Sequence, residues 1–138
     1  MSDTSTQDTT DSPRPISNGV DEQKPEISYD DFAKLDIRVG TVRAAELIPD
    51  TDKLLKCTVD FGDPPAGGLG LRTIVSGIAL FRTPEEIVGK QLPYIVNLAP
   101  RMLRGVESQG MLLAASPGGD GLALLIPDNE VANGTRLK

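Results

Sequence analysis

Apolar and polar residues alternate most regularly between positions 55 and 61. The odd positions hold Leu, Cys, Val and Phe, and the even positions hold Lys, Thr and Asp. Because successive side chains of a strand point to opposite faces, this pattern predicts a half-buried β-strand over 55–61. Further short runs of strand-forming residues predict strands over 37–47, 73–80, 92–98, 111–115 and 122–126. The chain is therefore expected to be an all-β protein.

Two short helices interrupt this strand pattern. Ser28 has the residue type of an N-cap and Asp31 follows three positions later, which predicts a helix that ends near Leu35. Residues 83–89 read Thr-Pro-Glu-Glu-Ile-Val-Gly, with an N-cap threonine, a proline at the first helical position, a glutamate at the third and a terminal glycine. They predict a second helix of about two turns.

The order of these elements favours one architecture. Gly40 and Gly77 interrupt two of the strands, and a glycine within a strand usually marks a bulge or a tight bend. Residues 117–120, Pro-Gly-Gly-Asp, predict a turn that joins the last two strands. Short strands with one small helix between the third and fourth match a five-stranded Greek-key barrel, the OB-fold, better than a sandwich of about seven strands.

The polar residues also define where the domain begins. Residues 1–30 contain seven acidic and two basic side chains, and the first 26 are rich in Ser, Thr, Asp and Pro with almost no apolar residues. Such a segment buries too little surface to offset the entropy lost on ordering. We predict a disordered acidic tail over 1–26 and one folded domain over 27–138.

Composition excludes several kinds of chemistry. The 138 residues include no histidine, so histidine-based triads and zinc sites are excluded. The single cysteine, Cys57, alternates inward with apolar residues and is expected to be buried rather than reactive. We expect no enzyme activity, no catalytic residue, no metal and no cofactor. The chain shows neither a secretory signature nor an apolar run of about 18 residues, which predicts a cytoplasmic location without membrane insertion.

Charge along the domain is uneven. The whole chain has a formal net charge of −6, yet residues 72–104 hold five basic side chains against two acidic ones. This local excess predicts either a basic face or ordinary scattered surface charge. Phe81 and Tyr94 are the only aromatic residues in that segment, so few rings are available to stack bases.

One segment indicates the function of the chain more specifically than the composition does. Residues 97–111 read Asn-Leu-Ala-Pro-Arg-Met-Leu-Arg-Gly-Val-Glu-Ser-Gln-Gly-Met. This run resembles the N-L-x-P-[RK]-x-[ML]-[RK]-G-x-x-S-x-G-M signature of the tRNA-binding domain family, an OB-fold module that occurs free or attached to aminoacyl-tRNA synthetases. Residues 32–40, 52–54 and 74–78 resemble the family's F-x-K-x-D-I-R-V-G, D-K-L and I-V-S-G-[IL] blocks in the same order. Met102-Leu103 replaces the commoner Lys-Met, so one family cation is missing.

The chemistry of this segment fits contact with RNA. Pro100 is expected to end a strand and to leave Arg101 and Arg104 in a rim loop, where their guanidinium groups reach phosphates. Gly105 would permit a close approach or an unusual turn; turn formation for Gly105 and core packing for Met111 remain alternatives to contact with RNA. Asn97 and Ser108 would bond sugars or base edges, and Met111 would form an apolar lip. The candidate RNA-binding residues are Arg72, Ser76, Arg82, Lys90, Asn97, Arg101, Arg104, Gly105, Ser108 and Met111.

The resemblance implies a homodimer that binds structured RNA, foremost tRNA, without catalysis. Residues 122–126 and the N-terminal helix are expected to contribute to the dimer contact. Two alternatives stay open. A CsaA-type chaperone would bind unfolded, export-destined precursor polypeptides in a hydrophobic rim pocket, which the nearly neutral charge of the domain favours. A separate tRNA-binding partner of methionyl-tRNA synthetase is the other alternative.

Overall fold

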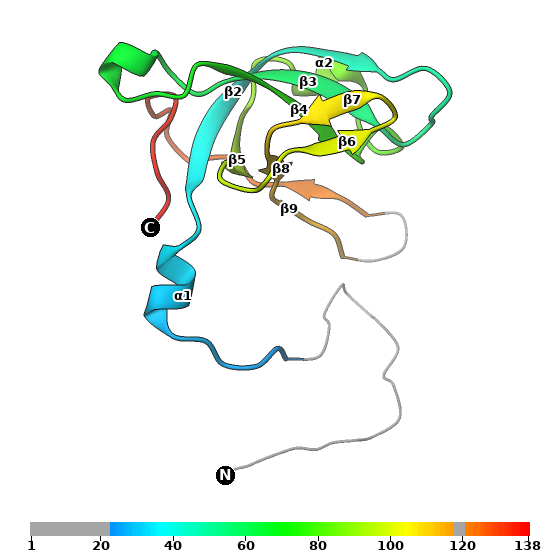
Figure 1. Cartoon of the computed structure of the whole chain (residues 1–138). Helices are drawn as coiled ribbons and strands as arrows, with labels where there is room; N and C mark the ends of the chain where they lie inside the picture. Colours follow the sequence, from blue (N-terminus) through cyan, green and yellow to red (C-terminus); the bar gives the residue numbers. More distant parts are fainter. Residues whose placement is uncertain (1–22, 118–120) are drawn as a thin grey trace, which may run out of the picture.

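The computed structural model describes residues 23–117 and 121–138. The predicted acidic tail falls mostly on residues 1–22, and the predicted turn mostly on 118–120, so both predictions lie largely outside the described residues. Within the described part, short strands dominate and two short helices accompany them (Figure 1). The elements are α1 (Tyr29–Ala33), β2 (Ile37–Leu47), β3 (Leu55–Asp60), η1 (Pro64–Ala66), β4 (Leu71–Ser76), α2 (Pro84–Ile87), β5 (Gln91–Ile95), β6 (Arg101–Leu103), β7 (Val106–Ser108), β8 (Met111–Leu112), β9 (Ala114–Ala115) and β10 (Ala123–Leu124).

Five strands form one curled antiparallel sheet in the order β4-β3-β2-β5-β8. β2, β3 and β4 follow one another as a meander, and β5 returns after α2 to pair with the far edge of β2. This return of the fourth strand to the first is the Greek-key connection. The predicted all-β, OB-type fold is therefore confirmed, with β6–β7 and β9–β10 as two additional two-stranded pairs.

The last residue of β7 and the residue after it bring the two ends of the curled sheet together. The backbone amide of Gln109 donates to the carbonyl oxygen of Thr73 in β4 at 2.8 Å, and the Gln109 side-chain oxygen accepts from the Thr73 amide at 2.9 Å. The hydroxyl of Ser108 accepts from the amide of Val75 at 3.0 Å. These bonds satisfy the edge of β4, which would otherwise carry unpaired backbone groups. The curled sheet closes across this joint.

The barrel interior is filled by the alternating residues of β3 and by large side chains from its neighbours. Cys57 is 1% exposed, so its predicted burial is confirmed, and this burial raises the pKa of its thiol to about 11. The rings of Phe61 and Tyr94 meet edge to face with centroids 5.5 Å apart. The main buried cluster comprises Val42, Leu55, Cys57, Val59, Phe61, Ile74, Ile78, Ile87, Leu92, Tyr94 and Val96.

Gly40 has a different role from the predicted bulge. The register between β2 and β3 shifts between Val42 and Ala44 and not at Gly40. A Cβ at Gly40 would lie 2.5 Å from a methyl carbon of Val59 and 2.7 Å from the ring of Phe61. Glycine is needed at position 40 because the side chains of the adjacent strand occupy the space above it.

Both predicted helices form with the expected caps, but α2 has only four residues, about one turn rather than the predicted two. The Ser28 hydroxyl accepts from the amide of Asp31 at 3.2 Å, and α1 ends at Ala33, close to the predicted Leu35. Thr83 and Glu86 form the reciprocal capping box of α2, in which each side chain bonds the other residue's backbone amide. These local signals were sufficient to place both helix starts.

Several predicted strands were too long. The strand predicted over 73–80 ends at Ser76, because residues 78–82 form a turn in which the amides of Phe81 and Arg82 donate to the carbonyl of Ile78. The strand predicted over 92–98 ends at Ile95. The run 111–115 divides into β8, which pairs with β5, and β9, which pairs with β10. The apolar run 111–115 is continuous in sequence although its pairing partner changes from β5 to β10. The hydrophobic pattern does not indicate that change.

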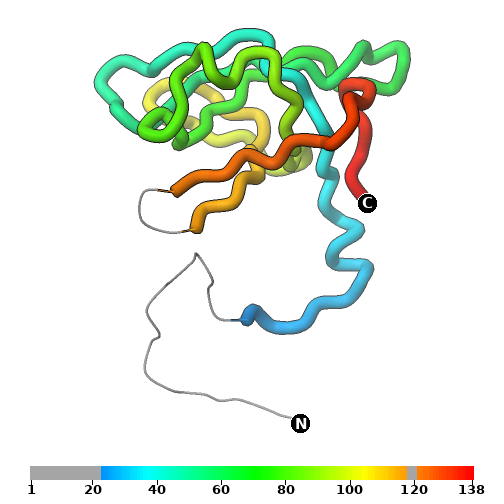
Figure 2. Tube along the Cα trace, turned by 180° about the vertical axis from the view of Figure 1, so that it is seen from behind, coloured from blue at the N-terminus to red at the C-terminus, as the bar shows by residue number. Residues whose placement is uncertain are grey.

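The C-terminal residues run along the first half of β2. Amides of Gly134 and Leu137 donate to the carbonyls of Val39 and Ile37 at 2.7 and 2.8 Å. This C-terminal strap, residues 126–137, crosses the side of the barrel that faces the viewer in Figure 2. No helix in the described residues is long and apolar enough to cross a membrane.

Candidate nucleic-acid interface

The central part of the 97–111 segment is a β-hairpin rather than the predicted loop. Arg101 pairs with Ser108 and Leu103 pairs with Val106, which leaves a two-residue connection of Arg104 and Gly105. Both connecting residues have positive φ, 51° and 81°, as a type I′ turn requires. Pro100 does precede this change of direction, but the chain after it forms a new strand pair that projects beside β4 (Figure 1).

This hairpin has two chemically different faces. Side chains alternate along a strand, so Arg101 shares a face with Leu103 and with Ser108, whose side chain bonds β4. Met102, which is 65% exposed, pairs with Glu107 on the opposite face. The carboxylate therefore stands on the outer face, and Arg101 stands on the face turned toward the barrel rim. A polyanion would meet less repulsion at the inner face and the tip than at the outer face.

The turn presents Arg104 at the tip. Its side chain is exposed, and no carboxylate within the described residues lies in ion-pair distance of Arg101 or Arg104. A non-glycine residue with φ near 50° occupies a sparsely populated backbone region. Gly105 fits because its own φ favours glycine; a Cβ there would touch nothing within 4 Å.

Lys53 lies at the same end of the barrel, and the sequence prediction missed it. Leu55 pairs with Ser76, and Ser108 bonds Val75, so the chain before Leu55 and the hairpin tip both extend beyond the end of β4. The β2–β3 connection and the β6–β7 turn accordingly project toward the same side in Figure 1. Lys53 is exposed and forms no ion pair within residues 23–117 and 121–138. Its signal in the sequence was the Asp-Lys-Leu block. We call Lys53, Arg101 and Arg104 the cationic end.

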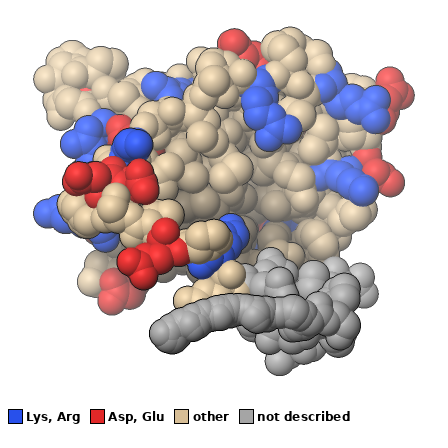
Figure 3. Space-filling view, turned by 60° about the horizontal axis from the view of Figure 1, so that its bottom comes forward, with Lys and Arg blue, Asp and Glu red and all other residues tan. Residues whose placement is uncertain are grey.

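Five of the other cations are paired with a carboxylate within the described residues. Arg38 and Arg136 both bond Asp36, and Arg43 bonds Asp60 at 2.9 Å. The side-chain hydrogen bond from Arg38 lowers the pKa of Asp36 most strongly. Lys34–Asp31 and Lys56–Glu46 are further pairs. On the face shown in Figure 3, basic and acidic side chains accordingly lie next to one another at several places.

Four of the predicted RNA-binding residues hold the fold together. Asn97 donates to the carbonyl of Lys34 at 2.7 Å and accepts from the amide of Asp36 at 2.9 Å, which fixes the joint between α1 and β2. Ser108 also donates to the carbonyl of Gly110 at 3.1 Å. The guanidinium of Arg72 bonds the carbonyls of Val96 and Gln109, and that of Arg82 bonds those of Phe81 and Leu122.

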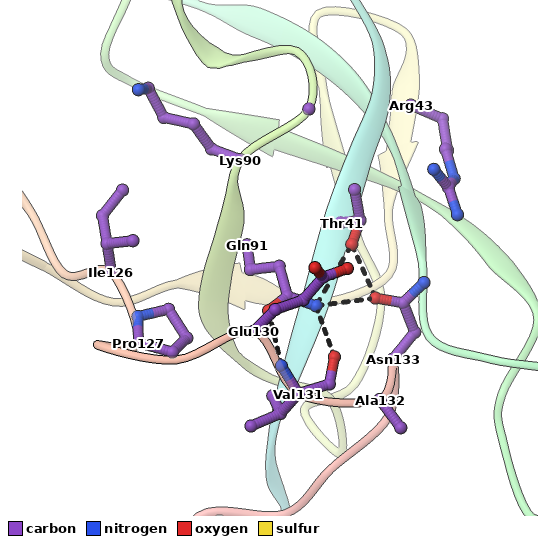
Figure 4. Close-up of a pocket in the computed structure, with 11 residues that line it drawn as sticks. Thr41, Arg43, Lys90, Gln91, Ile126, Pro127, Glu130, Val131, Ala132 and Asn133 are labelled. Carbon is purple, nitrogen blue, oxygen red and sulfur yellow. Dashed lines mark hydrogen bonds between the residues drawn. The ribbon is translucent and has the colours of Figure 1, made fainter.

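The remaining predicted residues lie in different places. Ser76 is buried at the end of β4, and Met111 is 40% exposed in β8 opposite Ile95. Lys90 lies away from the hairpin, in a groove of about 670 Å³ between β2 and the C-terminal strap. Figure 4 shows that groove around the bonded side chains of Thr41, Gln91 and Asn133. The structure therefore brings Arg101, Arg104 and Gly105 together and leaves Lys90 apart.

The site has the character of a binding surface. Among the described residues, no group of three or more His, Cys, Asp or Glu side chains is placed to hold a metal ion. Exposed guanidinium and ammonium groups bind phosphates through charge and directed hydrogen bonds.

Residues 37–136 match the family model described as "Putative tRNA binding domain". The chain belongs to this tRNA-binding domain family. The match spans all five strands of the barrel and the β6–β7 hairpin, so the resemblance inferred from the four sequence blocks is confirmed.

The curated relatives are much longer proteins. The chain is 50% identical over 113 residues to the methionine–tRNA ligase of Porphyromonas gingivalis, a match that covers 82% of this chain and 16% of the ligase. It is 47% identical over 117 residues to the methionine–tRNA ligase of Methanosarcina mazei, covering 85% of this chain and 16% of that ligase. The chain thus spans about a sixth of the length of these relatives.

Solved structures of similar size share the fold. A MetRS-related protein from Pyrococcus horikoshii superposes with a TM-score of 0.74 at 42% identity, over 83% of this chain and all of that chain. The chaperone CsaA of Bacillus anthracis superposes with a TM-score of 0.72 at 30% identity, again over 83% of this chain and all of that one. These structural neighbours thus include one protein named for its relation to MetRS and one named as a chaperone.

Proposed function

We propose that the chain binds tRNA through the cationic end, without catalysis of its own and in the cytoplasm. The observation that carries this proposal is the β6–β7 hairpin, which presents Arg104 at its tip and Arg101 on its inner face without carboxylate partners in the described residues. Seven of the nine other cations within the described part of residues 27–138 are paired with a carboxylate or bonded to carbonyls, and Lys90 and Lys138 are not. The hairpin cations are therefore available to phosphates without first losing a partner. Family membership supports tRNA as the ligand.

The similarity to methionine–tRNA ligases suggests what this chain contributes and which protein it would partner. Because this chain matches only 16% of their length, their aminoacylation activity is not transferred to it. We propose that the chain supplies tRNA binding alone, and that a methionyl-tRNA synthetase is a candidate partner. The other candidate RNA contacts, Met111, Asn97 and Ser108, are proposed to support the hairpin rather than to lead the contact.

We further propose a homodimer. Ile27 and Tyr29 are 63% and 76% exposed, and α1 contains no buried residue. Near the C-terminus, an apolar groove of about 270 Å³ is lined by Val39, Pro93, Leu125, Ile126, Pro127 and Leu137. A second copy would cover both apolar surfaces. Light scattering is expected to give twice the 14.7 kDa chain mass; the mass of one chain at micromolar concentration contradicts the dimer.

Polypeptide capture is the second candidate function. It is favoured by exposed apolar side chains, notably Met102 at 65% and Leu71 at 64%, and by the likeness to CsaA. The two candidates differ in their response to salt. Phosphate contacts release counterions, so tRNA affinity falls steeply as salt rises, whereas apolar burial is nearly independent of salt.

One comparison separates these functions. The pure protein is titrated with tRNA and, separately, with an unfolded precursor polypeptide at several salt concentrations. Binding of tRNA with a steep negative salt slope is the expected result. Salt-independent binding of the polypeptide, together with negligible tRNA binding, would transfer the proposal to the chaperone function.

A further inference from the structure

The acidic excess of this chain is concentrated near its start. Residues 1–26 contain six acidic and two basic side chains, a net charge of −4, and lie before the first helix. The cationic end, in contrast, holds three side chains without carboxylate partners in the described residues. A polyanionic segment of the same molecule has the chemistry to occupy the same groups as a phosphate chain.

The acidic residues are joined to the barrel through α1. α1 emerges from a joint that Asn97 fixes by its bonds to Lys34 and Asp36, at 2.7 and 2.9 Å. Asn97 is also the fourth residue before Arg101, at the start of the segment that leads into β6. α1 lies below the barrel in Figure 1, on the side away from the β6–β7 turn, so the acidic residues must span the barrel to reach the cationic end.

The tether is long enough. Residues 1–22 alone span at most about 75 Å when fully extended. A domain of this size has a radius of gyration of about 13 Å. The acidic side chains can therefore reach every part of the cationic end, and such a tether provides a local concentration on the order of millimolar.

We propose that the acidic side chains of residues 1–26 occupy the cationic end when no RNA is bound, and that tRNA must displace them. The inference rests on the proposed function and adds an intramolecular competitor to it. The competitor lowers the apparent affinity for tRNA by the fraction of molecules in which the cationic end is already occupied. The chain would thus bind polyanions more weakly at low salt than its barrel does alone.

The first test removes the charge and keeps the length. A variant with Asn or Gln at Asp3, Asp8, Asp11, Asp21, Glu22 and Glu26 is compared with the original chain. It is expected to bind tRNA about threefold or more tightly at roughly 50 mM salt, and equally at roughly 300 mM, because screening weakens the competing contact. In an Arg101→Ala, Arg104→Ala background the gain is expected to disappear. An equal gain in both backgrounds, or none in either, overturns the proposal.

The second test detects the contact without RNA. A nitroxide is attached through Ser5→Cys, and Cys57 does not compete for the label because it is buried and the pKa of its thiol is about 11. Amide signals of residues 101–108 are expected to broaden, and to recover when tRNA or salt is added. Absence of that broadening overturns the proposal. If no variant binds tRNA although the signals broaden, the proposed function fails while the intramolecular contact stands.

Discussion

Two neighbouring parts of the 97–111 segment differ in what their side chains do. Toward its two ends, the side chains of Asn97 and Ser108 bond backbone groups of distant elements, at 2.7 to 3.0 Å, and close the fold. In its middle, Arg101 and Arg104 have no such partners in the described residues and are exposed on the hairpin. A single sequence motif therefore combines residues that build the barrel with residues that are free to contact a ligand.

The residues that build the barrel also position the residues that are free to contact a ligand. Closure of the barrel by Ser108 holds β7 beside β4, and β7 in turn positions the turn that carries Arg104. Asn97 and Ser108 are therefore expected to determine the stability of the fold. Arg101 and Arg104 are expected to determine the affinity for tRNA. Substitutions in the two parts are therefore expected to change different measured quantities.

The largest effect is expected from Arg101→Ala combined with Arg104→Ala. Loss of two charged phosphate contacts is expected to weaken tRNA binding by about 1–3 kcal/mol per contact. The slope of log affinity against log salt is expected to become shallower by roughly one to two, because fewer counterions are released. Stability changes little, since neither side chain is buried.

A matched control removes the same charge elsewhere. Lys34→Ala with Lys56→Ala deletes two exposed cations that are paired with Asp31 and Glu46. This variant is expected to retain most of the tRNA affinity and the original salt slope. Equal losses in the two double variants would mean that net charge, and not the hairpin, determines binding.

Ser108→Ala is expected to give the largest change in stability. The substitution leaves the buried amide of Val75 without its acceptor, which costs about 1–3 kcal/mol of unfolding free energy. Denaturant unfolding measures the loss, with the exposed Ser116→Ala as the control. The tRNA affinity of the folded protein is expected to be nearly unchanged. A fall in affinity at unchanged stability would instead place the Ser108 hydroxyl on the RNA.

Asn97→Ala is expected to have a smaller effect at the joint of α1. Its two hydrogen bonds are exposed, so the loss is about 1 kcal/mol. Hydrogen exchange at the amide of Asp36 is expected to accelerate, because that amide loses its acceptor. Asn129→Ala, another exposed asparagine, is the control. An unchanged exchange rate at Asp36 would contradict the proposed role of Asn97 at the joint between α1 and β2.

The sequence predicted the local features of this fold well. The alternation over 55–61 placed β3, and the cap residues Ser28 and Thr83 placed both helix starts, because these signals lie within a few residues of the structure they determine. The change of partner between β8 and β9 depends on the pairing of β8 with β5, which lies before the β6–β7 hairpin in sequence, whereas β9 pairs with the nearby β10. Periodicity carries no information about that pairing.

The sequence identified several residues of the candidate site. It did not show which cations are free to contact a ligand and which are bonded within the fold. Arg101 and Arg104 were identified as exposed cations, and their placement on a strand and a two-residue turn was missed. Arg72 and Arg82 looked equally available in sequence, yet their guanidinium groups bond backbone carbonyls. Lys53 joins the cationic end only through the register of β3 with β4. These distinctions arise from tertiary contacts.

The smallest effect is expected at the tip of the β6–β7 hairpin. At Arg104, the stability of the turn and the affinity for tRNA are expected to change in opposite directions. Arg104 has a φ of 51°, which a side chain adopts at a cost, so Arg104→Gly is expected to raise the unfolding free energy by about 0.5–1 kcal/mol. The same substitution removes a phosphate contact and is expected to weaken tRNA binding. Gly105→Ala is the matched counterpart: its φ of 81° makes the alanine strained although nothing crowds the Cβ, so stability is expected to fall while both arginines remain. Thermal unfolding and tRNA titration of both variants measure the two properties separately. If Arg104→Gly lowered stability, the turn would not be strained at Arg104, and the inference that the tip gives up stability to present a cation would be wrong.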